Sequence, residues 1–318
     1  MKYPSIVVLF TSYRCNARCI MCSAWQKKIP HPELSLEDIK HIFSDTILTR
    51  SVETINITGG EPTLRDDLVE IVKILTDRCI NLKRIDISTN GIDNFKVIDQ
   101  IEQLLAYILQ TEIRLTVSVS VDGVGDTHDV VRGIPGAFDK VDKTIDDLKE
   151  LMILYPTFSA GMNTTVNKVN YNNLNSILDY SIKKGLGTNF TLAAISEIGV
   201  ESALLRDNFE LGCEEKKEIL TFIKYLLSQN QLNSLYGEFL LHWLKAGERK
   251  GPCAFRRGKA ILCEPDGSVY LCGNFREFRI GNLLHQSFEQ IINYRNNFLN
   301  FYEIKCKSCN SNCYIDAA

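Results

Sequence analysis

The sequence lacks long apolar runs, basic clusters, internal repeats and low-complexity segments. No stretch approaches the roughly 20 apolar residues that a membrane-spanning helix needs. The first apolar run, Ser5 to Phe10, is too short for the core of a signal peptide, and no small-residue cleavage site follows it. The formal net charge of −3 gives no sign of a nucleic-acid-binding surface. We therefore expect a cytoplasmic protein with no membrane and no nucleic acid among its partners.

The composition is that of an ordinary globular protein, with 45% apolar and 24% charged residues. A length of 318 residues suits one large domain and one small one. We expect a first domain at residues 1–200, a helical linker region at 201–250 and a small C-terminal module at 251–318.

Cysteine is abundant, with eleven residues that fall mainly into two groups. Three lie between Cys15 and Cys22, and six lie between Cys253 and Cys313. Clustered cysteines in a reducing compartment indicate metal binding or catalysis rather than disulfides. Cys79 stands alone, as does Cys213, and both are expected to be ordinary small hydrophobic residues.

Up to about residue 195, segments typical of strands alternate with segments typical of helices. The expected strands are Ser5–Thr11, Glu53–Thr58, Arg84–Asn90, Arg114–Asp122, Phe158–Val166 and Asn189–Ile195. The expected helices are Leu36–Leu48, Asp66–Asp77, Asn94–Leu109, Ala137–Leu154 and Asn172–Lys184, the first of them opening on a capping box of Ser35 and Asp38. This alternation predicts parallel βαβ units, either as a doubly wound sheet or as an incomplete barrel.

The strand interiors favour the barrel. Apolar and polar residues alternate along several strands, as in Val117, Ser118, Val119 and Ser120. Because side chains on a strand alternate between its faces, one face is apolar and the other polar. Parallel strands covered on both faces would be apolar throughout. We therefore expect an α/β fold with a partial (β/α)6 TIM-like barrel and a polar lumen; the alternative is that the polar groups only satisfy one another.

In the C-terminal third, the residue pattern predicts a helical region followed by a cysteine-rich hairpin and a helix. Residues 214–245 have helical spacing, and Gly247 to Gly251 is expected to be a linker. The segment Pro265-Asp266-Gly267 separates two short apolar runs and predicts a hairpin. With a two-residue turn, Cys263 would pair with Tyr270 and share a face with Cys272. A helix is expected from about Ser287 to Leu299.

The first cysteine group, Cys15, Cys19 and Cys22, is a CX3CX2C run directly after the first strand. A [4Fe–4S] cluster normally takes four protein thiolates, so three would leave one iron open for another ligand. A structural zinc ion needs a fourth ligand, and His31 and His41 are poorly spaced to supply it. Zinc remains an alternative for this run taken alone.

This run, together with Gly59-Gly60-Glu61-Pro62 at the end of the second strand, resembles the radical S-adenosylmethionine (SAM) superfamily. The resemblance implies a [4Fe–4S] cluster on the three cysteines whose open iron chelates SAM. It also implies reductive cleavage of SAM to a 5′-deoxyadenosyl radical, which abstracts hydrogen from a substrate.

The resemblance also implies which residues contact SAM. The two glycines allow close backbone approach to a ligand, Glu61 can accept from an ammonium group, and Pro62 rigidifies the turn. Met21 is expected beside the adenine. Arg132 would either pair with the SAM carboxylate or be a solvated surface residue. The remaining polar candidates, expected near the ribose, are Ser88, Asn90, Ser118, Ser120 and Asp122. His128 is expected to be structural, and no general acid or base is assigned.

The second cysteine group resembles the SPASM/twitch module, which carries auxiliary [4Fe–4S] clusters. The resemblance includes the hairpin and the following Gly281-Asn282-Leu283 segment. One auxiliary cluster is expected, with Cys253, Cys272, Cys306 and Cys309 as its ligands. Cys263 and Cys313 are left open as further ligands, and a structural zinc ion is the alternative for the whole module.

The expected function is therefore that of a radical SAM enzyme that modifies ribosomally made peptides or proteins. The alternative is dehydrogenation or rearrangement of a small molecule such as a sugar, aminocyclitol or cofactor precursor. The remote alternative is a non-catalytic iron–sulfur or zinc protein. The expected partners are the substrate and an electron donor such as flavodoxin or ferredoxin. A leader-binding domain ahead of Cys15 is not expected.

Overall fold

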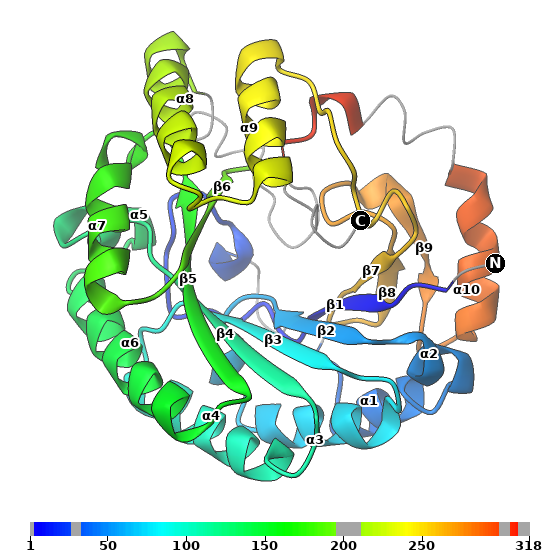
Figure 1. The fold of residues 1–318 in the computed structure, drawn as a ribbon. Coiled ribbons are helices and arrows are strands. Elements are labelled where there is room, and N and C mark those ends of the chain that lie inside the picture. The colour runs from blue at the N-terminus through cyan, green and yellow to red at the C-terminus, as the bar shows by residue number, and fades with distance from the viewer. Residues whose placement is uncertain (1–2, 27–32, 195–210, 299–305, 311–318) are drawn as a thin grey trace.

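A computed structural model describes residues 3–26, 33–194, 211–298 and 306–310. Its centre is a strongly curved sheet with helices on the outer side of the curve (Figure 1). Within the described residues, the helices are too short or too polar to cross a bilayer.

Six parallel strands build the barrel in chain order. They are β1 (Ile6–Phe10), β2 (Thr54–Thr58), β3 (Arg84–Thr89), β4 (Arg114–Ser120), β5 (Phe158–Val166) and β6 (Thr188–Leu192). The expected α/β fold and partial barrel are confirmed. The end expected for the sixth strand, Ile195, lies outside the described residues.

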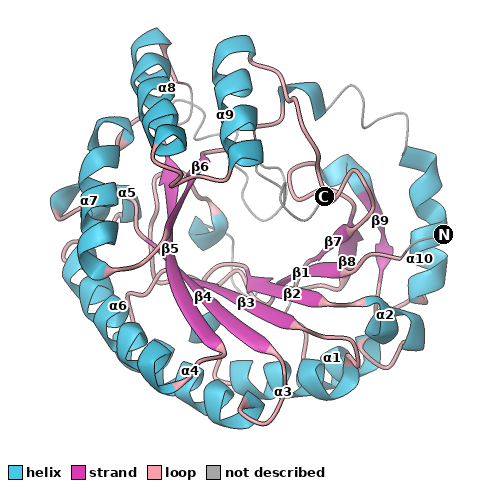
Figure 2. Cartoon of the chain, in the orientation of Figure 1, coloured by secondary structure: helices cyan, strands magenta, loops and turns pink. Residues whose placement is uncertain are grey.

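Helices cover the convex face of these strands, as Figure 2 shows for α3, α4 and α6. The helices of the barrel are α1 (Leu36–Ile42), α2 (Thr46–Ser51), α3 (Leu68–Arg78), α4 (Asn94–Ile108), α5 (Asp126–Arg132), α6 (Ala137–Leu154) and α7 (Leu174–Lys184). Along β4 the apolar residues are buried and the intervening polar ones are half-buried. The apolar face therefore packs under the helices and the polar face lines the concave side.

Three helical segments differ from the sequence prediction. The expected helix Leu36–Leu48 is two helices, because Asp45 accepts hydrogen bonds from the backbone of Ile47 and Leu48 and so begins α2. The capping box at the start of α1 is confirmed. Helix α5 was not expected, and α7 starts at Leu174 after a short 3-10 turn, η3 (Tyr171–Asn173).

The C-terminal region extends the barrel sheet. Its elements are α8 (Cys213–Ser228), α9 (Ser234–Ala246), β7 (Ala260–Cys263), β8 (Ser268–Tyr270), β9 (Arg279–Asn282) and α10 (Phe288–Tyr294). Strand β7 pairs in parallel with β1, so the hairpin forms part of one nine-stranded sheet. The domain boundaries at residues 200 and 250 stay predictions. The expected helix from Ser287 gives way to a 3-10 turn, η6 (Arg295–Phe298), and its expected end, Leu299, lies outside the described residues.

The predicted hairpin register is wrong by one residue. Cys263 pairs with Val269 rather than with Tyr270, which lies opposite Leu262. The turn takes three residues, because Gly267 adopts a φ of 80° and donates its N–H to the carbonyl of Glu264 at 2.9 Å. A one-residue shift moves a side chain to the other face of a strand. Cys263 therefore does not lie on the face of the hairpin that it was predicted to share with Cys272.

Asp45 caps two helices at once, which makes it a test of how the C-terminal region is held. Its second carboxylate oxygen accepts from the backbone N–H of Phe288, at the start of α10, at 2.9 Å. We expect Asp45→Ala to lower the free energy of unfolding by about 1–3 kcal/mol, because two helix starts lose an acceptor.

The matched control is Asp93→Ala, which removes the acceptor for a single backbone N–H at the start of α4 and should cost about 1 kcal/mol. Chemical denaturation of both variants in the same cofactor state measures the difference. Equal losses in the two variants would contradict the bridging role of Asp45.

Candidate active site

The three cysteines of the first group lie on the loop that follows β1. They line a cavity of about 290 Å³ at the carboxyl ends of the barrel strands. Burial, together with the neighbouring Glu61, Cys19 and Cys22, raises the pKa of Cys15 to about 12. Metal binding favours the thiolate form of such sulfurs, because the metal supplies positive charge. The donor set and its setting therefore fit a metal cluster.

The glycines of the Gly-Gly-Glu-Pro turn fix the beginning of this loop. The backbone N–H of Gly60 donates to Ser12 and that of Glu61 donates to Arg14, both at 2.7 Å. A Cβ atom on Gly59 would lie 2.3 Å from the carbonyl oxygen of Ser12, and one on Gly60 would lie 2.1 Å from that of Arg14. The two glycines line the cavity, as expected, but the backbone that they approach most closely is that of the cysteine loop.

Glu61 stabilises the Gly-Gly-Glu-Pro turn through hydrogen bonds. Its carboxylate accepts from the backbone and hydroxyl of Thr63, from the hydroxyl of Thr89 and from the backbone N–H of Asn90, at 2.6–3.2 Å. The side chain is buried, and neither Glu61 nor Pro62 lines the cavity. This carboxylate thus joins the end of β2 to the end of β3, and the role expected for it toward an ammonium group stays a prediction.

Helix α5 places Arg132 against the cysteine loop. Its Nη2 atom lies 2.7 Å from the carboxylate of Asp122, and its Nη1 atom lies 3.5 Å from the sulfur of Cys19. Burial opposes the charged form, but Asp122 and the sulfurs of Cys19 and Cys15 keep the pKa of Arg132 above its ordinary value. Arg132 is buried and lines the cavity, so the surface-arginine alternative is wrong. Its expected contact with a SAM carboxylate stays a prediction.

Asp122 and His128, which lie next to Arg132, form hydrogen bonds with the backbone. Asp122 is fully buried, accepts from the backbone N–H of Thr165 at 2.7 Å and does not line the cavity. The Nδ1 atom of His128 accepts from the backbone N–H of Asp122 at 3.1 Å. Burial, aided by Arg132, lowers the pKa of His128 to about 3, so the ring is neutral at neutral pH. These contacts agree with the structural role expected for His128.

The remaining candidates divide between the cavity and the sheet. The cavity is lined by Met21, Ser88, Asn90 and Ser120. Ser118, two residues before Ser120 on β4, does not line it. The amide of Asn90 donates to Asn16 at 2.7 Å within the cysteine loop. Residues that were not singled out also line the cavity: Ala17, Thr58, Thr89, Thr165, Ala193 and Ala194. Thr58 and Thr165 belong to the alternating polar sets of β2 and β5, which was the signal for them.

The second cysteine group brings together the four residues expected as auxiliary ligands. Burial raises the pKa of Cys272, and Cys309, Cys253 and Cys306 raise it further, which places these four sulfurs near one another. The pKa of Cys306 is likewise raised, to about 11, by burial and by two of the other sulfurs. A buried group of four thiols suits a metal centre.

Cys263 lies apart from this group. Burial raises its pKa to about 12, and the charges that add to the shift belong to Asp266 and Glu264 rather than to a cysteine. Its sulfur lies 3.6 Å from the carbonyl oxygen of Glu264. Cys313, the other residue left open, lies outside the described residues.

Among residues 3–26, 33–194, 211–298 and 306–310, no three His, Cys, Asp or Glu side chains converge closely enough to hold a single metal ion. One zinc ion lies about 2.3 Å from each thiolate, whereas a four-iron cluster is ligated at separate iron corners. Thiolate ligands alone suit either kind of centre.

Two hydrogen bonds join the region of the first cysteine group to the C-terminal region. The hydroxyl of Tyr13, two residues before Cys15, donates to the carboxylate of Glu264 in the hairpin. The amide of Asn310, one residue after Cys309, donates to the carbonyl of Ala193 at the cavity wall, at 2.7 Å. The C-terminal region thus contacts both the cysteine loop and the cavity.

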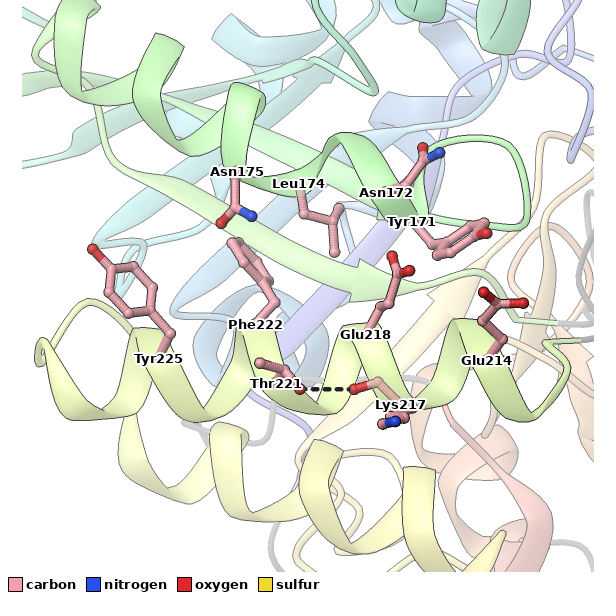
Figure 3. A pocket seen from close by; sticks show the side chains of 10 residues that line it. All are labelled: Tyr171, Asn172, Leu174, Asn175, Glu214, Lys217, Glu218, Thr221, Phe222 and Tyr225. Atoms are coloured by element: carbon pink, nitrogen blue, oxygen red, sulfur yellow. Dashed lines mark hydrogen bonds between the residues drawn. The ribbon is translucent and has the colours of Figure 1, made fainter.

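A larger hollow, of about 560 Å³, lies between η3, α7 and α8 (Figure 3). Tyr171, Leu174 and Phe222 line it together with the carboxylates of Glu214 and Glu218, and Tyr225 lies at its other end. None of its lining residues is a cysteine or one of the predicted site residues. The smaller cavity over the cysteine loop is therefore the candidate active site.

The close approach at Gly60 yields a direct test. We expect Gly60→Ala to push the cysteine loop away from β2 and to abolish metal binding at Cys15, Cys19 and Cys22, because the added Cβ overlaps backbone atoms that cannot rotate away. Iron and sulfide per chain after anaerobic reconstitution should fall by about four each.

Gly187→Ala is the matched control, because a Cβ atom there meets nothing within 4 Å and the backbone is not in the left-handed region. It should retain the iron content of the wild type. Full iron binding by Gly60→Ala would refute the account of the turn.

Curated relatives share sequence with the chain over different extents. AdoMet-dependent heme synthase from Methanosarcina barkeri is 31% identical over 186 residues, covering 58% of this chain and 48% of the relative. The antilisterial bacteriocin subtilosin biosynthesis protein AlbA from Bacillus subtilis is 24% identical over 286 residues, covering 89% of this chain and 58% of the relative. The chain thus spans about half the length of these relatives.

The fold also matches a solved structure, that of Streptococcus suis SuiB bound to precursor peptide SuiA. The TM-score is 0.66 at 14% identity, and the match covers 99% of this chain and 73% of SuiB.

A sequence model of the SPASM family, described as an iron–sulfur cluster-binding domain, matches residues 253–314. A model of the radical SAM superfamily matches residues 9–180, more than half of the chain. Because this match covers the cysteine loop and strands β2 to β5, whose ends line the cavity, the chain belongs to the radical SAM superfamily.

Proposed function

We propose that the chain cleaves SAM reductively at a [4Fe–4S] cluster held by Cys15, Cys19 and Cys22, and that it modifies a peptide by hydrogen abstraction. The observation that carries the proposal is that three cysteines, the buried Cys19 and the half-buried Cys15 and Cys22, line one cavity together with polar side chains from the strand ends. When bound there, the cluster and SAM would supply a 5′-deoxyadenosyl radical. Reductive cleavage consumes one electron, so a donor such as flavodoxin or ferredoxin is part of the proposal.

The protein's own contribution is to hold the sulfurs and to balance their charge. The Gly59-Gly60 turn sets where the loop starts, and Arg132 brings a positive charge to within 3.5 Å of the Cys19 sulfur. Asp122 fixes that guanidinium from the other side. A cation held beside thiolates stabilises their charged form and a bound anionic group alike.

The cavity walls support the binding of a polar cofactor. Hydroxyl groups of Ser88, Ser120 and Thr165 and the amide of Asn90 come from three neighbouring strands and their ends. Such groups can bind ribose hydroxyls and a carboxylate. Met21, on the cysteine loop, offers a polarisable surface to an adenine ring.

The C-terminal group supports a second metal centre in this proposal. We assign one auxiliary [4Fe–4S] cluster to Cys253, Cys272, Cys306 and Cys309, which are buried and mutually close. Such a centre would accept an electron or anchor the substrate. Cys263 is left out because its neighbours are Asp266 and Glu264.

A peptide is favoured as the substrate by the extent of the matches. The match to AlbA, a bacteriocin biosynthesis protein, covers 89% of this chain. The matched structure of SuiB contains a precursor peptide and aligns with 99% of this chain. The heme synthase match is higher in identity but covers only 58% of the chain, and it favours the second candidate, radical chemistry on a small cofactor precursor.

SAM cleavage is tested by anaerobic incubation with SAM and dithionite. We expect 5′-deoxyadenosine from the wild-type chain and only the level of a protein-free blank from Cys15→Ala, because the cluster loses one of three ligands. Cys213→Ala removes an exposed cysteine outside both groups and should leave the yield unchanged. Product formation by Cys15→Ala at the wild-type rate would overturn the proposal.

The peptide substrate is tested by mass spectrometry. The reconstituted chain is incubated with SAM, dithionite and the peptides encoded by short reading frames next to its gene. We expect a mass change in one peptide together with a rise in 5′-deoxyadenosine. If none of the peptides changes, while an iron porphyrin precursor raises the 5′-deoxyadenosine yield, the small-molecule function replaces this one.

A further inference from the structure

Arg249, in the segment expected to be a mere linker, contacts the auxiliary cysteines. Its Nη1 atom lies 3.7 Å from the sulfur of Cys309, and its Nη2 atom donates to the carbonyl of Pro252 at 2.8 Å. The guanidinium carbon lies 4.8 Å from the ring centroid of Phe239 in α9. The backbone N–H of Arg249 also donates to Lys307, two residues before Cys309, at 2.5 Å. The guanidinium is thus held in place on several sides.

Asn274 contacts the sulfur of Cys309 as well, and also that of Cys272. Its side-chain amide lies 3.6 Å from the sulfur of Cys309, and its backbone N–H lies 3.4 Å from the sulfur of Cys272. Asn274 is 8% exposed. Cys309 therefore receives two N–H donors, one of them on a side chain that is always positively charged.

Donors and positive charge at ligating sulfurs have a known physical effect. They stabilise the electron-rich form of an iron–sulfur centre more than the oxidised form, so they raise its reduction potential. The effect is larger where the donor is charged and shielded from solvent.

We propose that Arg249 and Asn274 are positioning residues that raise the reduction potential of the auxiliary cluster through Cys309. This inference rests on the auxiliary cluster proposed above. A purely structural Arg249 would explain the contacts with Phe239 and Pro252, but it would not require a guanidinium nitrogen beside a sulfur.

The potential is measured in the full-length chain that carries Cys15→Ala, Cys19→Ala and Cys22→Ala, so that only the auxiliary cluster contributes. An anaerobic redox titration followed by electron paramagnetic resonance gives its midpoint. In Arg249→Gln we expect the ratio of oxidised to reduced cluster at a fixed potential to rise about tenfold, a shift of about 59 mV to lower potential. Asn274→Ala should shift it in the same direction by less, because the side-chain amide that it removes from Cys309 is uncharged.

Two further variants separate a hydrogen bond from charge alone. Arg249→Lys keeps the charge but lacks the fork that reaches Pro252 and Cys309 together, so it should restore the midpoint only in part. Arg257→Gln removes an exposed positive charge four residues after Cys253 and should leave the midpoint within the error of the titration.

The outcomes are distinct. A midpoint in Arg249→Gln and Asn274→Ala equal to that of the parent, at about four irons per chain, overturns the inference while the auxiliary cluster stands. An Arg257→Gln shift as large as that of Arg249→Gln overturns it as well, because charge alone then accounts for the effect. Absence of iron from the parent triple variant would overturn both this inference and the auxiliary cluster.

Discussion

The structure depends on one close contact between two stretches of backbone, where the Gly59-Gly60 turn meets residues 12–14. The hydrogen bonds there continue the parallel pairing of β1 and β2 beyond the ends of both strands. Only glycine permits this, because a Cβ atom at either position would overlap a carbonyl group of the facing loop. Cys15, the first of the three proposed ligands, follows immediately. The position of the metal site is thus set by backbone geometry before any sulfur is considered.

The other end of the cysteine loop is held by α5. The N–H groups of Arg18 and Ile20 donate to the carbonyls of Arg132 and Val131 at 2.8 and 3.0 Å. The same helix supplies the guanidinium that lies beside Cys19 and is paired with Asp122. A buried pair of this kind contributes little net stability, and removing either partner leaves an unpaired buried charge. The Arg132–Asp122 pair instead fixes the position of one positive charge beside the cysteine sulfurs.

The sequence predicted the strands, the grouping of the cysteines and part of the cavity wall because each leaves a local pattern, such as the polar alternation that includes Ser120. It did not predict helix α5, whose seven residues carry no long periodic signal. It assigned Cys263 to the wrong pairing because the turn has three residues rather than two, a difference decided by the conformation of Gly267. It treated Arg249 as part of a linker because the contact with Cys309 joins segments that are 60 residues apart.

The central claim is that three thiolates hold a cluster with one open iron that binds SAM. The most direct measurement is the electron paramagnetic resonance spectrum of the dithionite-reduced chain in which Cys253, Cys272, Cys306 and Cys309 are replaced by alanine. The account predicts one reduced [4Fe–4S] signal whose g values change when SAM is added. A signal that is unaffected by SAM, or a protein without iron, would contradict it.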